Sequence, residues 1–203
     1  MSNEELLEGV TREVVVCIKC RLWKSRRNAV PGVGNPECRV LLIGEGPGQS
    51  EDLKGEPFVG PAGKFLDSQL SNIGFSRTDV FITNVVKCRP PRNRDPQLDE
   101  IATCTPYLNR QIAILEPRFI ITMGKHSTAY VLSKANLPFQ SITQAHGKVY
   151  EASLFGMKVA IFPTFHPAAA LYSAQYKDQL EEDFQQIRNE LSKRGLLTLS
   201  SYK

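Results

Sequence analysis

The stretch Arg39-Val-Leu-Leu-Ile-Gly-Glu-Gly-Pro-Gly48 decides the fold, because a short apolar run passes directly into a turn rich in glycine and proline. An apolar run without polar alternation is typical of a strand that is buried on both faces, as in a parallel sheet. We predict a strand over residues 39–43 that ends at Gly44. The glycines that follow allow the backbone to approach a ligand closely.

The rest of the chain alternates strands with helices. Apolar runs predict three more strands, over residues 80–83, 119–123 and 159–162. Apolar residues at helical spacing predict helices near residues 2–14, 61–73, 97–115 and 125–132, and a long last helix that ends at Gly195. Strands that alternate with helices of this length form a mostly parallel sheet covered on both faces. We therefore expect an α/β fold with a single domain over residues 1–195 and a short tail over residues 196–203.

Size and composition are those of an ordinary globular protein. The 203 residues, 41% hydrophobic and 23% charged, suffice for a core that needs neither disulfides nor metal. Lys and Arg exceed Asp and Glu by 25 to 21, and this net charge of +4 permits a nucleic-acid partner without requiring one. No apolar run approaches the ~20 residues of a membrane span, and the acidic N-terminus is unlike a signal peptide. We expect a cytoplasmic protein with no membrane partner and with reduced cysteines.

Three unusual segments each follow directly after a predicted strand. They are Gly44-Glu-Gly-Pro-Gly48, Asn84-Val-Val-Lys-Cys-Arg-Pro-Pro91 and Pro163-Thr-Phe-His-Pro167. The carboxyl ends of parallel strands share one rim of the sheet, where open α/β sheets bind ligands, so we expect the segments to meet in one cleft. The first segment lacks the Gly-Lys-Ser/Thr of a P-loop, which argues against a nucleotide-phosphate site. Phe58, Asn84 and His166 would each be structural in most proteins, and only their joint placement at the rim indicates a site.

The five cysteines divide by their spacing. Cys17 and Cys20 form a C-x2-C pair, Cys88 and Cys104 follow far downstream with 15 residues between them, and Cys38 stands alone. A tight turn between paired cysteines aims two thiolates at a common ion. Four thiolates can hold either zinc or an iron–sulfur cluster, and spacing alone does not separate the two.

One ordered set of motifs runs through most of the chain. It consists of Cys17-x2-Cys20, Gly44-Glu-Gly-Pro-Gly48, Pro57-Phe-Val-Gly-Pro-Ala-Gly63, Asn84-x3-Cys88-Arg-Pro-Pro91, Cys104 and His166-Pro-Ala-Ala-Ala-Leu171. Each motif is weak by itself, but the ordered set is specific, and it resembles that of the family 4 uracil-DNA glycosylases. The resemblance implies a three-layer α/β/α fold with a central four-stranded, mostly parallel sheet. It also implies removal of uracil from DNA during base excision repair, and a [4Fe–4S] cluster. The ligands of that cluster would be Cys17, Cys20, Cys88 and Cys104, with Cys38 as a bystander.

The resemblance further implies a role for each side chain of the cleft. Phe58 would stack on a uracil that has been flipped out of the DNA. Asn84 would read the Watson–Crick edge of the base by donating to O4 and accepting from N3–H, a pattern that cytosine inverts. His166 would donate to O2 of uracil as the glycosidic bond breaks, assisted by backbone amides around Gly46 and Gly48.

One position departs from the wider superfamily. Classical uracil glycosylases carry an aspartate that orients the attacking water, and Gly46 stands at that position here. Glu51 is the nearest carboxylate that could hold the water together with the backbone. Glu45 is another, although it could instead fix the loop. We predict hydrolysis that leaves an abasic site, without cleavage of the DNA strand.

Several basic and apolar residues are candidates for contacts with DNA or with a partner protein. Arg89, Arg92 and Arg94 could bind phosphates, with ordinary solvated surface as the alternative. Leu171 lies where the superfamily carries its intercalating residue, to within one position. The tail residues Leu199 and Tyr202 are spaced like the anchors of a sliding-clamp-binding peptide, with a frayed end as the alternative. We expect a monomer.

Two other functions stay open from the sequence. A related glycosylase with broader choice could take hypoxanthine or other deaminated bases, because the volume of the pocket cannot be read from the sequence. Alternatively, the protein could bind nucleic acid without catalysing a reaction, with a metal that only cross-links the chain. This second alternative explains the cysteines and basic segments, but it gives no reason for Asn84 and His166 to meet at one rim.

Overall fold

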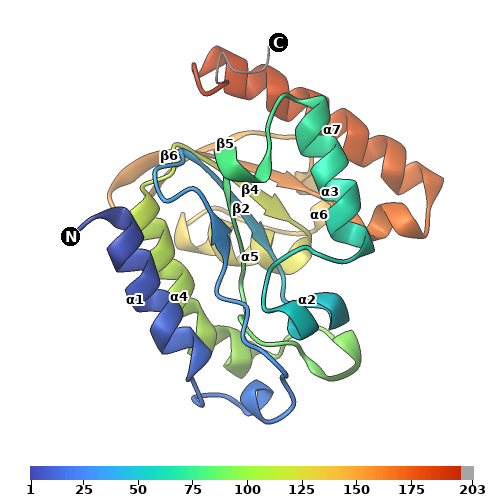
Figure 1. Cartoon of the computed structure of the whole chain (residues 1–203). Coiled ribbons are helices and arrows are strands. Elements are labelled where there is room, and N and C mark those ends of the chain that lie inside the picture. The colour runs from blue at the N-terminus through green and yellow to red at the C-terminus, as the bar shows by residue number, and fades with distance from the viewer. Residues whose placement is uncertain (198–203) are drawn as a thin grey trace.

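In the computed structural model, which describes residues 1–197, parallel strands form the centre of the sheet (Figure 1). These strands are, in spatial order, β3 (Phe81–Asn84), β2 (Val40–Gly44), β4 (Phe119–Met123) and β6 (Met157–Thr164). Each overlaps one of the four strands predicted from the sequence. Their burial explains the agreement, because β2, β3 and β4 are buried along their whole length and therefore read as uninterrupted apolar runs.

The sheet has six strands, so the expectation of a four-stranded sheet was wrong at both edges. β1 (Val33–Gly34) pairs antiparallel with β3, and β5 (Tyr150–Leu154) pairs antiparallel with β6. β1 has only two residues, too few for any periodicity. β5 is only partly buried, so it has no apolar run. It joins β6 through Phe155 and Gly156, whose φ values of 50° and 85° suit a tight hairpin turn.

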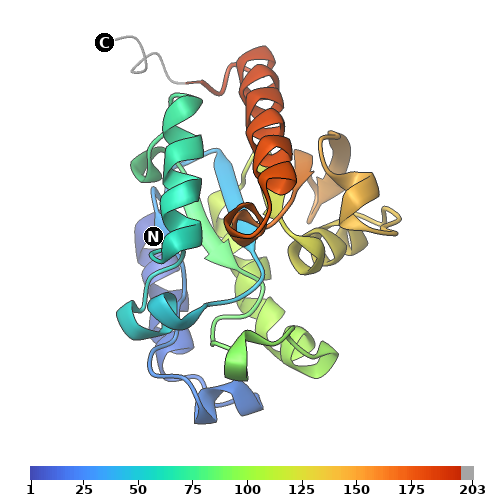
Figure 2. The same ribbon diagram turned by 90° about the vertical axis from the view of Figure 1, so that its right-hand side faces the viewer.

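Helices cover both faces of the sheet, which gives three layers (Figures 1 and 2). One face is covered by α1 (Asn3–Val15), α4 (Leu98–Leu115) and α5 (Lys125–Lys134), and the other by α3 (Pro61–Asn72) and α7 (Ala174–Lys193). The short helices are α2 (Gln49–Lys54), α6 (Ile142–Ala145), and the 3-10 turns η1 (Arg21–Lys24), η2 (Arg77–Asp79), η3 (Pro91–Asn93) and η4 (Pro167–Leu171). No helix within residues 1–197 combines the length and the apolar content needed to cross a membrane.

Alternate residues of each central strand serve two separate cores. In β2, Leu41 and Ile43 pack on the side of α1 and α4, whereas Val40 and Leu42 pack on the side of α3 and α7. All four of these side chains are buried, and the two cores hold the sheet rigidly between the helices. The loops that leave the carboxyl ends of β2, β3 and β6 are thereby fixed at one rim.

Candidate active site

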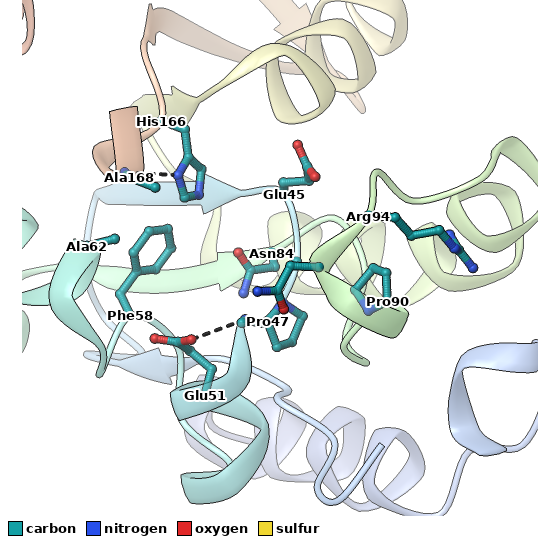
Figure 3. Close-up of a pocket in the computed structure, with 13 residues that line it drawn as sticks. Glu45, Pro47, Glu51, Phe58, Ala62, Asn84, Pro90, Arg94, His166 and Ala168 are labelled. Atoms are coloured by element: carbon teal, nitrogen blue, oxygen red, sulfur yellow. Dashed lines mark hydrogen bonds between the residues drawn. The ribbon is translucent and has the colours of Figure 1, made fainter. Parts of the chain in front are cut away.

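A cavity of about 270 Å³ lies where the loops after β2, β3 and β6 meet (Figure 3). Its lining comes from these three loops, from α2, α3 and the segment between them, and from η3 and η4 with the residues beside them. The lining residues are Glu45, Gly46, Pro47, Gly48, Glu51, Phe58, Ala62, Asn84, Pro90, Asn93, Arg94, His166 and Ala168. The structure thus brings together all six residues that the sequence analysis placed in the cleft: Glu45, Gly46, Glu51, Phe58, Asn84 and His166.

Asn84 forms the floor of this cavity at the end of β3. The residue is 1% exposed, and within the described part of the chain its Oδ1 accepts no hydrogen bond. Its neighbour on β2 is Gly44, where a Cβ atom would lie 2.4 Å from Asn84 Oδ1 and 2.7 Å from Cζ of Phe58. Glycine at position 44 therefore allows both side chains to reach the floor. An unpaired buried amide oxygen is costly, so this atom is suited to receive a donor from a ligand.

Phe58 presents its ring to the cavity from a strained loop. Its φ of 53° is rare for a residue with a bulky side chain, and its ring centroid lies 5.6 Å from that of His166. Arg77 stabilises this conformation by donating to the carbonyl oxygens of Pro57 and Phe58, and its Nε donates to Asp67 Oδ1 at 2.6 Å. Nothing in the local sequence indicates this role for Arg77, which the sequence analysis did not single out.

Glu51 connects two loops of the cavity wall. Its Oε1 accepts from the backbone amides of Val59 and Gly60, both at 2.9 Å. Its Oε2 accepts from the backbone amide of Gly48 at 3.1 Å, the dashed line at Glu51 in Figure 3. The loop after β2 is thereby joined to the Phe58 loop. The carboxylate borders the cavity, but backbone amides already use both of its oxygens. Glu51 therefore holds the two loops together through their backbone amides.

The packing beneath Phe58 makes a testable prediction about Gly63. A Cβ atom at this position would lie 1.7 Å from the carbonyl oxygen of Phe58, a contact that only movement of the loop can relieve. We expect Gly63→Ala to lower the free energy of unfolding by about 2–4 kcal/mol and to weaken catalysis by displacing Phe58. Chemical denaturation measures the first effect. The matched control is Gly9→Ala in α1, where the nearest atom is 3.9 Å away, and we expect it to stabilise the protein by about 0.5–1 kcal/mol. Equal stability of the two variants would contradict this packing.

His166 lies next to Phe58 in the cavity lining and has a defined tautomer. Its Nδ1 accepts a hydrogen bond from the backbone amide of Ala168 at 3.2 Å, so in the neutral ring the proton is on Nε2 (Figure 3). Burial lowers the pKa of His166 to about 4, which keeps the ring neutral at neutral pH. The site therefore offers a neutral N–H donor opposite an aromatic face.

Glu45 lies at the edge of the cavity within a charged network. Burial raises its pKa above the ordinary value. His126 Nε2 lies 3.7 Å from Glu45 Oε2 and 3.3 Å from Asp95 Oδ2, and Lys125 Nζ donates to Asp95 Oδ2 at 2.5 Å. No sequence pattern noted above predicted this network. The signal that could have found it is the position of Lys125 and His126 directly after β4, whose carboxyl end lies at the same rim.

Four of the five cysteines are close neighbours on the face of the sheet that α1 and α4 cover. Burial raises the pKa of Cys20, Cys88 and Cys104, the last to about 12, and in each case neighbouring members of the set Cys17, Cys20 and Cys88 raise it further. They come from the turn after α1, the loop after β3 and the middle of α4. Cys38 lies apart from them: burial raises its pKa to about 11, and no other cysteine contributes.

The two buried sulfurs of this set also accept hydrogen bonds. Arg26 Nη1 lies 3.2 Å from Cys88 Sγ, and the backbone amide of Lys87 lies 3.2 Å from Cys104 Sγ. Donors of this kind favour the thiolate form that binds metals. The donor set, four thiols of which two accept hydrogen bonds, is therefore suited to a soft metal centre.

Lys87 is the single lysine of the segment after β3, and the sequence analysis did not consider its role. The side chain is 1% exposed and lies outside the cavity lining. Its Nζ donates to Thr83 Oγ1 at 2.6 Å, to the carbonyl oxygen of Asn84 at 2.7 Å and to Gln111 Oε1 at 2.7 Å. Burial lowers the pKa of Lys87 to about 7.

The predicted DNA-binding arginines occupy different environments. Arg94 is paired with Glu100 through two hydrogen bonds of 2.8 and 2.6 Å, and Arg89 Nε donates to Asn93 Oδ1 at 2.7 Å. Arg92 is exposed, with a φ of 56°. The structure therefore gives Arg94 an intramolecular partner that the sequence pattern did not reveal.

Large apolar side chains are exposed shortly after His166. Leu171 is 45% exposed at the end of η4, and the next residue, Tyr172, is 88% exposed. The predicted clamp-binding residues Leu199 and Tyr202 lie outside the described residues.

The sequence belongs among known DNA-repair proteins. The family model described as the uracil DNA glycosylase superfamily matches residues 31–192. A type-4 uracil-DNA glycosylase of Saccharolobus solfataricus is 51% identical over 197 residues, which are 97% of this chain and 91% of the relative. Type-4 enzymes of Sulfurisphaera tokodaii and Archaeoglobus fulgidus are 52% and 45% identical, covering 90% and 98% of this chain and 83% and 99% of the relatives. This chain belongs to the uracil DNA glycosylase superfamily, and within it to the type-4 enzymes.

Proposed function

We infer that this protein is a DNA-repair enzyme that removes uracil from DNA by hydrolysing its N-glycosidic bond. The type-4 relatives carry the name of this activity. One structural observation carries the inference: the unpaired Oδ1 of Asn84 lies in a cavity that the ring of Phe58 and the neutral His166 also line. Nucleic-acid binding without chemistry would leave this combination unexplained.

We propose that Asn84 recognises the base through both groups of its side-chain amide. Uracil presents an N3–H donor and an O4 acceptor, which match the amide oxygen and the amide nitrogen. Cytosine presents an acceptor at N3 and an amino donor at C4. The amide oxygen of Asn84 would then face another acceptor, and its amide nitrogen would face another donor. A site built around such hydrogen bonds rejects the wrong base strongly, because unpaired buried polar groups are costly. This pattern favours uracil over cytosine.

The chemistry we propose stabilises the departing base. The bond between N1 of uracil and C1′ of the deoxyribose breaks with its electron pair going to the base. The oxygen of a water molecule bonds to C1′, and the proton that this water loses neutralises the departing uracil anion. His166 donates from Nε2 to O2, where negative charge develops, and amides around Gly46 and Gly48 assist it. Because backbone amides already occupy Glu51, we assign it to positioning the Phe58 loop, and Glu45 is the carboxylate that can hold the water.

The product would be an abasic site in an intact strand. A glycosylase that also cleaves the strand needs an amine to form a Schiff base, and no lysine is among the cavity-lining residues. For DNA contacts, we propose that Arg92 and Arg89 bind phosphates and that Leu171 fills the gap left by the flipped nucleotide. Arg94 instead holds its loop through Glu100.

Incubating the protein with a duplex that carries one uracil tests this function. We expect free uracil and a strand that breaks only after alkali treatment, while a matched thymine duplex stays intact. Absence of uracil release would contradict the proposed activity. A break without alkali, or a borohydride-trapped adduct, would contradict hydrolysis without strand cleavage.

We propose that Cys17, Cys20, Cys88 and Cys104 hold a [4Fe–4S] cluster. The set of four cysteine sulfurs, two of which accept hydrogen bonds, supports this proposal, because thiolates hold iron–sulfur clusters. When bound, the cluster would cross-link the turn after α1, the loop after β3 and α4.

Serine variants of the cysteines test the cluster. We expect Cys20→Ser and Cys104→Ser to lose the brown colour and the content of about four iron atoms per chain, and to melt at a lower temperature. Cys38→Ser is the matched control, because Cys38 lies apart from the other four. Iron analysis and thermal melting measure both effects. Full iron content in Cys20→Ser, or iron loss in Cys38→Ser, would contradict the assignment.

A further inference from the structure

The buried side chain of Lys87 has no evident part in the chemistry described above. It is 1% exposed, and no carboxylate in the described part of the chain forms an ion pair with it. Burial of a charge is costly, and an apolar side chain of similar size, such as methionine, would avoid this cost. The presence of lysine here therefore calls for an explanation other than stability.

The geometry around Nζ indicates what the side chain does. Its three hydrogen bonds are directed to Thr83 and Asn84 at the end of β3 and to Gln111 in α4. Gln111 is itself held in place, because its Nε2 donates to the carbonyl oxygen of Pro31 at 2.8 Å. Lys87 therefore connects the backbone of Asn84 to Gln111 of α4.

Lys87 also contacts the cysteine set through its backbone. Its amide donates to Cys104 Sγ at 3.2 Å, and Cys88 is the next residue. The same residue therefore contacts Cys104 through its backbone and the carbonyl oxygen of Asn84 through its side chain.

We propose that Lys87 is a positioning residue for uracil recognition, because its side chain fixes the backbone of Asn84. This proposal rests on the proposed function, because it requires that Asn84 contacts the base.

A double-mutant cycle between Lys87 and Asn84 tests the proposal. The variants are Lys87→Met, Asn84→Ala and their combination, with Lys134→Met on the exposed side of α5 as a matched control. One measurement is inhibition by free uracil, which occupies the base pocket alone. The second is affinity for DNA that carries a stable abasic-site analogue, which leaves the base pocket empty. Iron content and melting temperature verify that each variant is folded.

We expect Lys87→Met to weaken inhibition by uracil about 10-fold and to leave affinity for abasic DNA within about 2-fold, because only the base contact depends on Asn84. In the Asn84→Ala background, the same substitution should have no further effect on inhibition by uracil. If Lys87→Met does not fold, Gln111→Met removes one acceptor of Nζ, and we expect a loss of about 3-fold with the same dependence on Asn84.

The outcomes separate the two proposals. Equal losses from Lys87→Met in both backgrounds, or no loss in either, would overturn the positioning role while leaving the proposed function intact. Unchanged inhibition by uracil in Asn84→Ala would contradict the contact between Asn84 and the base, and would overturn the positioning role together with it.

Discussion

Replacing Asn84 with alanine is expected to lower kcat/KM for uracil excision by roughly 10²- to 10⁴-fold. The side chain is fully buried and its Oδ1 is unpaired, so a bound uracil would form its hydrogen bonds in a site that water does not reach. Each hydrogen bond of this kind contributes about 1–3 kcal/mol when its loss leaves the partner unpaired. Two such bonds to the base account for the expected range. Single-turnover kinetics on a uracil-containing duplex measures the effect.

The control for this variant is Asn72→Ala, at an exposed position of α3. We expect it to retain wild-type kinetics, and we expect Asn84→Ala to retain its iron and its fold. An activity within threefold of the wild type in a folded Asn84→Ala protein would exclude Asn84 as the residue that reads the base.

Replacing His166 with alanine is expected to lower kcat by roughly 10²- to 10³-fold, with a much smaller change in KM. The loss falls on kcat because the hydrogen bond to O2 strengthens only as negative charge develops on the base. Rapid-quench kinetics at saturating substrate isolates this step. Loss of affinity with unchanged kcat would assign His166 to binding and contradict its catalytic role.

The pH dependence of His166 follows from its burial. The folded state favours the neutral ring, so His166 takes up a proton only as the pH falls towards its pKa of about 4, whereas an unfolded histidine does so near 6.5. Its contribution to stability is therefore complete above pH 6.5 and is lost between 6.5 and 4. We expect nitrogen NMR to find an Nε2–H tautomer that does not titrate between pH 8 and 5. A titration near 6.5 in the folded protein would contradict this.

The centre of the fold was predictable because local and tertiary signals agree there. The four parallel strands are buried, so each appears as an apolar run, and the helices between them carry apolar residues at helical spacing. The edges were not predictable, because β5 is half solvated and β1 is held by pairing with β3 rather than by its own sequence.

The candidate site divides in the same way. Phe58, Asn84 and His166 meet because each lies in or near a loop that follows a strand, and parallel strands end at one rim. Arg77, Lys87 and His126 escaped prediction because their roles depend on long-range contacts. Arg77, for example, reaches the carbonyl oxygen of Phe58 across 19 positions of sequence. Glu51 was identified as a cleft residue, but only its hydrogen bonds to the backbone indicate a positioning role.

The most direct test of the account is a crystal structure of the protein with free uracil. The account predicts that uracil occupies the cavity with its ring against Phe58, with O4 and N3 within hydrogen-bond distance of the Asn84 amide, and with O2 near Nε2 of His166. Uracil bound outside this cavity, or bound inside it without contact to Asn84, would contradict the central claim that these residues together read and release the base.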